Sequence, residues 1–390
     1  MPIPANGEPA PRFRAWTIDG QILGSDDLAG RFTTLCFFGS AGVPQMYEMI
    51  QAITANTEIF DGLDHQFVGV SIDPEDSAPE RGLGGAAPAV RWVMDSDQTL
   101  SRLFGAVAED GEGKGEGELE AEGEAESATG GDDVAFQPLT VLLDQNLRVL
   151  ASHKIDAPDK HPIALTQFLG ALPTFGPPRL AGLQAPVIFV PMAFEAEFCQ
   201  RLIAHFEETG GKPSGILEDV DGQTLLTFDP ERKRRQDLLL TEKALQQAAH
   251  ARIARRVAPE IKKAFQFDVT RLERSVIARY QTGDFHARHR DNDALGTAHR
   301  RFSITIPLNT EGYTGGHLRI PEFGPQIYQI PTGCAMVHSC GLLHEVTPVQ
   351  EGTRYAYIPI VYDEAAARLR EQNKEHLGEG VSGDRRETQD

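Results

Sequence analysis

Residues 280–292 read YQTGDFHARHRDN. A short segment ending in Tyr280 is followed by a glycine turn and then by His289 and Asp291, which are two positions apart. Alternate side chains of a β-strand point to the same face. One strand end can therefore present an imidazole and a carboxylate together, as a metal site requires. Because the chain has 12 His and 57 acidic residues, a local polar pair is the alternative.

A second histidine would have to come from a strand that is distant along the chain. His344 is the candidate, and Arg354 follows it ten positions later. Two histidines and one carboxylate leave coordination positions open, which is typical of non-haem Fe(II) oxygenases. A structural zinc site closes its fourth position with another Cys or His. If His344 only caps a strand end, there is no metal site.

Short strands and turns surround these residues. Residues 301–309 alternate, with apolar side chains at 302, 304, 306 and 308, which predicts a half-buried strand. Glycine pairs and Pro-Thr-Gly segments predict turns, and residues 335–338 and 354–361 are expected to form further strands. This order predicts a mainly-β domain.

The pattern resembles the prolyl 4-hydroxylase-like branch of the Fe(II)/2-oxoglutarate-dependent dioxygenases over about residues 182–363. The matching positions are Tyr280, Gly283, His289, Asp291, Leu308-Asn309, Gly315-Gly316, His344 and Arg354. The resemblance implies a double-stranded β-helix (jelly-roll) core with bracing helices. It also implies that His289, Asp291 and His344 are the catalytic residues that hold the iron. His317 departs from the pattern, since many relatives carry an acid there, but it lies outside the iron set.

The same resemblance implies how a co-substrate binds. Arg354 would pair with the distal carboxylate of 2-oxoglutarate, because a guanidinium is a planar bidentate donor. Tyr280 and Thr305 are candidates for hydroxyl contacts to that carboxylate. His286 is three positions before His289 and is expected to face away from it. We expect His286, His299 and His338 to be solvent-exposed or supporting residues rather than ligands.

The implied reaction consumes O2 and 2-oxoglutarate, releases succinate and CO2, and hydroxylates an unactivated C–H bond. The substrate would be an amino acid side chain, peptidyl or free, or a small metabolite, and L-ascorbate would keep the iron reduced. Two alternatives remain open. One is a catalytically inactive binding or sensing protein. The other is an O2-only or zinc-dependent dioxygenase with the same three ligands, because Arg354 alone argues for 2-oxoglutarate.

The N-terminal half predicts a three-layer α/β domain. Apolar segments at 32–38, 67–73, 90–95 and 138–144 are predicted strands, and runs at 45–60 and 98–104 are predicted helices. The segments APRF (10–13), VSIDP (70–74) and PLTVLLD (138–144) resemble the thioredoxin-like peroxiredoxin fold over about residues 5–172.

That resemblance lacks its reactive thiol. A peroxiredoxin needs a cysteine at the start of the helix that follows the predicted strand at 32–38, because the helix N-terminus lowers the thiol pKa. Residues 39–46 contain none, and Cys36 lies inside the predicted strand. We therefore expect a redoxin-like domain without thiol peroxidase activity.

We expect four regions. They are a thioredoxin-like domain (1–172), a Pro/Gly linker (173–186), the dioxygenase domain (187–363) and a helical, then disordered, tail (364–390). An acidic insert at 109–133 is predicted to be disordered. Helices at 193–209 and 241–258, the latter ended by Pro259, would brace the jelly roll. Residues 212–240 are expected to be irregular, and their basic run 232–235 to be a solvated loop or to shape the cavity mouth.

The composition of the chain indicates which classes of partner and which compartment to expect. A formal net charge of −20 argues against a nucleic-acid phosphate backbone. No stretch approaches the roughly 20 apolar residues that span a bilayer. The four cysteines form no Cys-x-x-Cys pair, and Cys36 and Cys199 are expected to be buried thiols. The expected location is a reducing cytoplasm.

Overall fold

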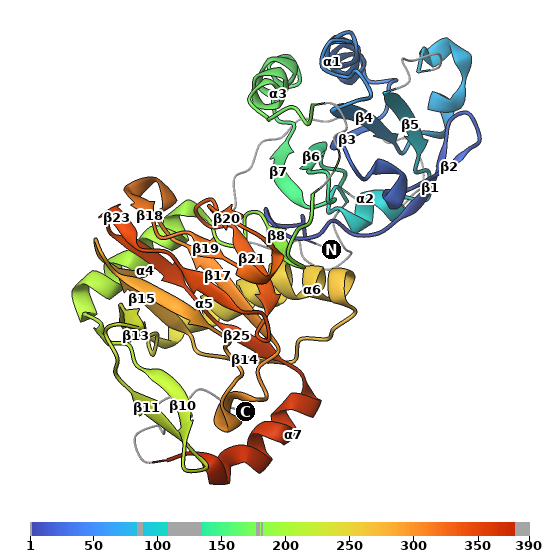
Figure 1. The fold of residues 1–390 in the computed structure, drawn as a ribbon. Coiled ribbons are helices and arrows are strands. Elements are labelled where there is room, and N and C mark those ends of the chain that lie inside the picture. Colours follow the sequence, from blue (N-terminus) through green and yellow to red (C-terminus); the bar gives the residue numbers. More distant parts are fainter. Residues whose placement is uncertain (1, 84–88, 108–134, 177–179, 181, 379–390) are drawn as a thin grey trace, which may run out of the picture. The chain divides into compact units, whose positions relative to one another are not determined.

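The computed structural model describes residues 2–83, 89–107, 135–176, 180 and 182–378 (Figure 1). They belong to two compact units, Met1–Pro178 and Arg179–Asp390. The predicted acidic insert at 109–133 and the tail beyond residue 378 lie outside the described residues. No described helix is long and apolar enough to cross a membrane.

The N-terminal unit is built on one seven-stranded sheet of order β2-β1-β5-β4-β3-β6-β7. Strands β3, β4 and β5 are parallel, and the remaining pairs are antiparallel. The strands are β1 (Arg14–Thr17), β2 (Ile22–Gly24), β3 (Phe32–Gly39), β4 (His65–Ser71), β5 (Val90–Met94), β6 (Leu139–Leu143) and β7 (Val149–Lys154). The helices are η1 (Ser25–Leu28), α1 (Pro44–Thr54), η2 (Pro74–Ser77), η3 (Pro79–Arg81), α2 (Thr99–Leu103) and α3 (His161–Gly170).

Both faces of this sheet are covered. Along β3, Cys36 and Phe38 pack into a core with α1 and α3, whereas Leu35 and Phe37 pack into a second core with α2. Successive residues of a strand face opposite sides, so a strand buried on both sides has to be apolar throughout. The expected three-layer, thioredoxin-like α/β domain is confirmed.

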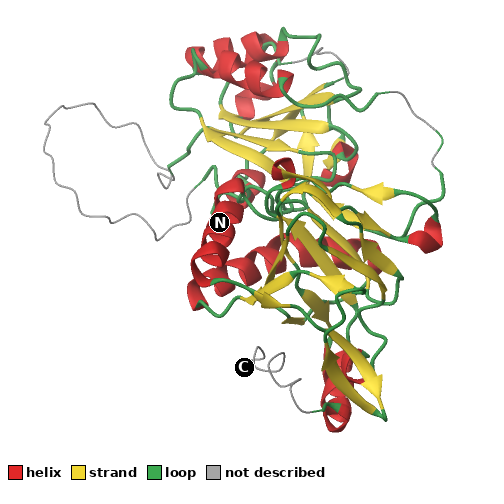
Figure 2. Cartoon of the chain, turned by 60° about the vertical axis from the view of Figure 1, so that its left-hand side comes forward, coloured by secondary structure: helices red, strands yellow, loops and turns green. Residues whose placement is uncertain are grey.

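The C-terminal unit is mainly β (Figure 2). A five-stranded sheet, β12-β16-β22-β19-β20, and a nine-stranded sheet containing β14-β25-β17-β24-β15-β13-β9 together line one cavity. The strands that carry the site are β15 (Val276–Tyr280), β16 (Phe285–His289), β17 (Phe302–Pro307), β22 (His344–Val346) and β24 (Arg354–Tyr357). The others are β8 (Ile188–Val190), β14 (Arg271–Glu273), β18 (Tyr313–Gly315), β19 (Leu318–Arg319), β20 (Ile327–Tyr328), β21 (Ala335–Ser339), β23 (Val349–Gly352) and β25 (Ile360–Tyr362). This arrangement is the jelly roll that the sequence predicts.

Helices brace the outer face of the larger sheet. Phe198 and Leu202 of α4 (Ala196–Thr209) pack into one core with Ile277, Ile304 and Ile306 of the sheet. Helix α5 (Lys243–Arg252), the π-turn η4 (Ile253–Val257) and α6 (Ala258–Phe265) add to the same core. Short 3-10 turns η5 (Leu295–Thr297), η6 (Thr310–Gly312) and η7 (Pro321–Phe323) link strands, and α7 (Glu364–Gln372) and η8 (Asn373–His376) follow the last strand.

Two predictions about this unit are wrong. Pro259 does not end the second bracing helix. It lies in the first turn of α6, directly after the π-turn, where a missing backbone N–H costs little. Residues 212–240 are not irregular. They form β9 (Lys212–Pro213), β10 (Ile216–Val220), β11 (Gln223–Thr227), β12 (Lys233–Arg234) and β13 (Gln236–Leu239), because pairing with neighbouring strands outweighs their polar composition.

Candidate metal centre

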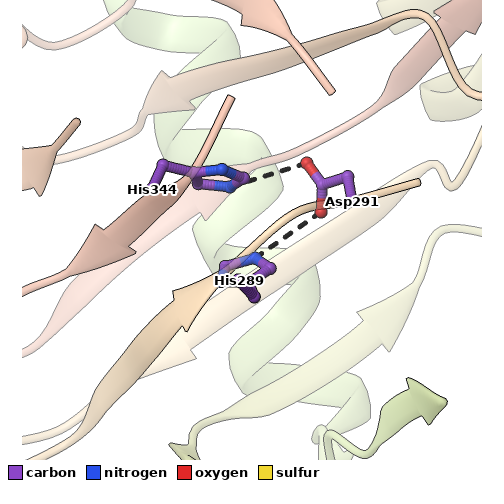
Figure 3. A group of neighbouring side chains, drawn as sticks. All are labelled: His289, Asp291 and His344. Atoms are coloured by element: carbon purple, nitrogen blue, oxygen red, sulfur yellow. Dashed lines mark ion pairs between the residues drawn. The ribbon is translucent and has the colours of Figure 1, made fainter. Parts of the chain in front are cut away.

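The structure brings His289, Asp291 and His344 together (Figure 3). His289 is the last residue of β16 and His344 the first of β22, and the two are register partners in the smaller sheet. Asp291 follows β16 and lies between them. Its Oδ1 is 3.6 Å from His289 Nε2, and its Oδ2 is 3.6 Å from His344 Nε2. The three ligand atoms lie within 4.8 Å of one another.

Backbone carbonyls orient both imidazoles. His289 Nδ1 lies 2.9 Å from the carbonyl oxygen of Ala287, and His344 Nδ1 lies 2.9 Å from that of Leu342. A carbonyl only accepts, so each Nδ1 carries the proton and donates it. The Nε2 lone pairs are therefore left facing Asp291, which is the tautomer that a metal ligand needs.

The charge states also suit a cation. Burial, and then the neighbouring His289, lower the pKa of His344 to about 4. Burial raises the pKa of Asp291, but His344 and His289 outweigh this effect and hold it well below its usual range. At neutral pH the site therefore offers a neutral imidazole at His344 and an ionised carboxylate.

Within the part of the chain that the structure describes, this is the one group of three or more His, Cys, Asp or Glu side chains with ligand atoms so close together. Two nitrogens and one carboxylate oxygen leave a six-coordinate metal with open positions. This set fits Fe(II) better than a closed zinc site, which requires a fourth protein ligand.

The pocket around this cluster contains the predicted co-substrate residues. Arg354, Tyr280 and Thr305 all line it. The Arg354 residue is 2% exposed, yet its Nε and Nη1 form no hydrogen bond, and its guanidinium lies 4.8 Å from the centre of the Tyr280 ring. Burying unpaired donors is costly. The pocket is therefore suited to an anion that accepts from Arg354.

Arg235 belongs to the basic run for which a place at the cavity mouth was one of two expectations, and it lines the pocket. Its Nη1 donates to the Tyr280 hydroxyl at 2.8 Å, and its Nε lies 2.8 Å from Asp237 Oδ1. Lys233 is also buried and donates to the carbonyl of Gly215 at 2.6 Å. The expectation of a solvated loop at 232–235 is wrong for these two residues, because internal acceptors replace water. Their two-residue spacing was the available signal.

Of the other histidines, His286 is not where it was expected. His286 stacks on His289 with ring centroids 3.6 Å apart, because a register shift between these two residues turns His286 to the same side. His338 is fully buried, 4.4 Å from the His344 ring, and His299 is buried against Glu273 at 3.0 Å. All three are buried, and His286 and His338 lie beside proposed ligands, whereas His299 pairs with Glu273. The expectation that His286 faces away from His289 is wrong.

In the N-terminal unit, a serine and an aspartate occupy the end of β3, where a peroxiredoxin would carry its reactive cysteine. The Ser40 hydroxyl donates to Asp73 Oδ2 at 2.6 Å just before α1. Cys36 is fully buried within β3, and burial raises its pKa to about 12. The thiol is therefore neutral and enclosed.

The fold and the cluster define a jelly-roll domain in which two histidines and one carboxylate are grouped as non-haem Fe(II) oxygenases group theirs. Residues 275–361 match the family model described as the 2OG-Fe(II) oxygenase superfamily. The C-terminal unit therefore carries a domain of this superfamily, and the matched span holds the metal cluster, Arg354, Tyr280 and Thr305.

Curated relatives are PKHD-type hydroxylases. The protein Synpcc7942_0015 of Synechococcus elongatus is 33% identical over 94 residues, which cover 23% of this chain and 42% of the relative. A PKHD-type hydroxylase of Hyphomonas neptunium is 33% identical over 82 residues, covering 20% of this chain and 37% of the relative. The chain thus spans less than half the length of these relatives.

Solved structures of two kinds are similar. A prolyl-4-hydroxylase of Pseudomonas putida aligns with a TM-score of 0.36 and 19% identity, covering 46% of this chain and 94% of that one. The peroxidoxin BcpB of Mycobacterium tuberculosis aligns with a TM-score of 0.34 and 18% identity, covering 44% of this chain and 99% of that one.

Proposed function

We propose that this chain is an Fe(II)- and 2-oxoglutarate-dependent dioxygenase of the hydroxylase type. His289, Asp291 and His344 would bind Fe(II), and Arg354 would bind the distal carboxylate of 2-oxoglutarate. The observation that carries the proposal is the buried, unpartnered guanidinium of Arg354 in the same pocket as the three ligands. A charged donor without an acceptor in such a pocket calls for an anionic ligand.

Each residue has a defined task. The two Nε2 atoms and the Asp291 carboxylate hold the metal, which when bound would supply the activation of O2. Arg354 fixes one end of the co-substrate, and the hydroxyls of Tyr280 and Thr305 add contacts to the same carboxylate. Arg235 holds the Tyr280 hydroxyl in place through the 2.8 Å hydrogen bond.

The proposed reaction converts 2-oxoglutarate and O2 to succinate and CO2 while one oxygen atom enters a substrate C–H bond. The substrate class is an amino acid side chain, peptidyl or free, or a small metabolite. Leu318, Val346 and Ile358 give the pocket apolar walls, which suits a C–H group and excludes water. L-ascorbate is the proposed reductant that maintains Fe(II). The four cysteines, all within the described residues, are buried and form no disulfide, which suits a reducing cytoplasm.

The test is an anaerobic titration with Fe(II), with and without 2-oxoglutarate, that follows the weak visible metal-to-ligand charge-transfer band. Wild type is compared with His344→Ala and with His376→Ala, a control on η8 far along the chain from the cluster. A band that requires both additions and is lost only in His344→Ala supports the proposal. Iron binding without a band would favour the O2-only dioxygenase, and no iron binding would leave a binding protein.

A further inference from the structure

The pocket contains a third arginine that the proposed iron and co-substrate chemistry does not use. Arg274 lines the pocket together with Arg235 and Arg354. Arg235 makes two side-chain hydrogen bonds, from Nη1 to the Tyr280 hydroxyl at 2.8 Å and from Nη2 to Asp237 Oδ2 at 3.0 Å. Arg274 has a weaker anchor, since its Nη2 lies 3.7 Å from Asp237 Oδ2 and its buried Nε has no hydrogen-bond partner. It therefore has donor capacity left for a ligand.

Arg274 and Arg354 line the pocket from different strands or strand ends. Arg274 precedes β15, whereas Tyr280 ends β15 and is the register partner of Arg354. The two guanidinium groups thus reach the pocket from different segments of the chain.

Two isoleucines form an apolar wall of the pocket. Ile358 donates its backbone N–H to the carbonyl of Val276 at 3.0 Å, two residues after Arg274, and its side chain lines the pocket with that of Ile360. A ligand anchored on Arg274 would therefore lay an aliphatic part against these isoleucines. The charged Arg274 and the apolar wall together favour a ligand, either a small molecule or a side chain, that has both a charged group and an aliphatic part.

The backbone of Arg274 is held in a disfavoured conformation. Its φ is 59°, in the left-handed region that residues with a side chain rarely adopt. The preceding residue explains how this is maintained, because Glu273 is buried and accepts from Arg300 Nε at 2.6 Å and pairs with His299 at 3.0 Å. The neighbouring network thus fixes the direction in which Arg274 leaves the chain.

The charges of the pocket also favour an additional anion. Arg235, Arg274, Arg354 and Asp291 line the pocket, and Asp237 pairs with Arg235 and Arg274, so these groups carry three positive charges and two negative ones. Bound Fe(II) and doubly charged 2-oxoglutarate would cancel each other. One positive charge then remains, and it is the under-coordinated Arg274.

We propose that Arg274 is a specificity-determining residue that binds a carboxylate of the substrate, while the aliphatic carbon to be hydroxylated lies along Ile358 and Ile360. This inference rests on the proposed dioxygenase function and names its substrate class as carboxylate-bearing aliphatic compounds. The carboxylate belongs either to a small acid, such as a free amino acid, or to an acidic side chain of a peptide.

The experiment measures anaerobic ligand binding to the full chain loaded with Fe(II) and 2-oxoglutarate, using the shift of the charge-transfer band. The probes are a pool of free aliphatic amino acids and monocarboxylates, the matching carboxamides, and terminally blocked peptides containing Asp or Glu. Wild type is compared with Arg274→Gln, Arg274→Lys and Arg274→Gly. Arg288→Gln is the control, because Arg288 is an exposed residue of β16 paired with Glu345 at 3.1 Å.

We expect a carboxylate pool, but not its carboxamides, to shift the wild-type band. Arg274→Gln should weaken that binding by about 10- to 100-fold, with Arg274→Lys intermediate and the affinity for 2-oxoglutarate within about twofold. Glycine adopts a φ of 59° without strain, so Arg274→Gly should fold stably. If this variant loses ligand binding but keeps its stability, misfolding is excluded as the cause. The pool that responds identifies the source of the carboxylate.

Three results would overturn the inference. They are equal binding of acids and carboxamides, equal binding by wild type and Arg274→Gln, or no response of wild type to any pool. If Arg274→Gln abolishes the charge-transfer band itself, Arg274 serves the co-substrate instead. If wild type gives no band at all, the proposed function fails and the inference fails with it.

Discussion

The rings of His286 and His289 stack with centroids 3.6 Å apart and an interplanar angle of 28°, although an odd number of positions separates them on one strand. The register shift in β16 makes this possible. Burial and the neighbouring His289 lower the pKa of His286 well below its usual range. His286 is therefore a neutral aromatic ring that stacks on the proposed ligand His289.

Removing the His286 ring should leave the His289 imidazole less firmly oriented. We expect His286→Ala to weaken Fe(II) binding by about 10- to 100-fold, as is usual when residues that support a metal ligand are lost. His286→Phe keeps an aromatic ring and should stay within about threefold of wild type. Anaerobic Fe(II) titration measures both, with His317→Ala as the control. Equal affinities for the alanine variant and wild type would show that the carbonyl of Ala287 alone orients His289.

Asp291 should be indispensable for the metal. Asp291→Asn removes the negative charge but keeps the shape, and we expect it to reduce Fe(II) affinity by at least about 100-fold, since both histidines face this carboxylate. Asp293→Asn, an equivalent change at an exposed residue two positions on, should have no effect. Metal content after desalting and the charge-transfer band provide the measurement. Iron retained by Asp291→Asn would remove this residue from the ligand set.

Arg354 should affect the co-substrate and not the metal. The loss of charge-assisted hydrogen bonds worth about 1.5–3 kcal/mol predicts that Arg354→Gln raises the Kd of 2-oxoglutarate by roughly 10- to 150-fold. Fe(II) binding without 2-oxoglutarate should be unchanged. Arg354→Lys should fall between the two, because an ammonium cannot bind a carboxylate in a bidentate manner. A Kd that does not change in Arg354→Gln would mean that another residue binds the distal carboxylate of 2-oxoglutarate.

The parts of the site that sequence could predict are those set by local spacing. His289 and Asp291 share a strand end, and their two-residue step already implies a common side. The pairing of β16 with β22, which brings His344 beside them, spans a long stretch of chain, and only the resemblance to a family indicated it. The alternation of apolar residues in β17 likewise predicted the fold, because burial follows a period of two.

The parts that could not be predicted depend on geometry that no pattern encodes. The shift in β16 reverses the side of His286, and a π-turn allows Pro259 to continue a helix. Arg235 and Arg274 lie in polar runs whose usual fate is solvent exposure. Their burial depends on Asp237, which belongs to a strand that is paired with β15. Such contacts arise from tertiary packing and not from propensity.

Glu195 should make the stability of the C-terminal unit depend on pH. Burial raises the pKa of Glu195, but hydrogen bonds from Arg256 and Arg252, the latter at 2.7 Å, lower it to about 2. Because this pKa is below the ordinary value of 4.5, the stabilisation is complete above about pH 5 and is lost as the pH falls towards 2. The side chain is one-third exposed, so we expect about 1–2 kcal/mol after allowing for screening.

The comparison of wild type with Glu195→Gln tests this expectation. At pH 7 the variant should unfold at lower urea concentration, and the difference should shrink below pH 4.5. Near-UV circular dichroism of tyrosine is a suitable signal. Both tryptophans, Trp16 and Trp92, lie in the N-terminal unit, so tryptophan fluorescence provides an internal control that should not change. A difference that is the same at pH 3 and pH 7 would exclude ionisation of Glu195 as its cause.

The N-terminal unit should be inert towards peroxide. Cys36 is fully buried, and burial raises its pKa to about 12, whereas an attacking thiol must be accessible and ionised. We expect native protein at pH 8 to react with a chromogenic disulfide at least about 100-fold more slowly than urea-unfolded protein, and Cys36→Ser to consume hydrogen peroxide no differently from wild type. Rapid native labelling of Cys36, or peroxide consumption that is lost in Cys36→Ser, would mean that β3 opens in solution and that this unit retains thiol chemistry.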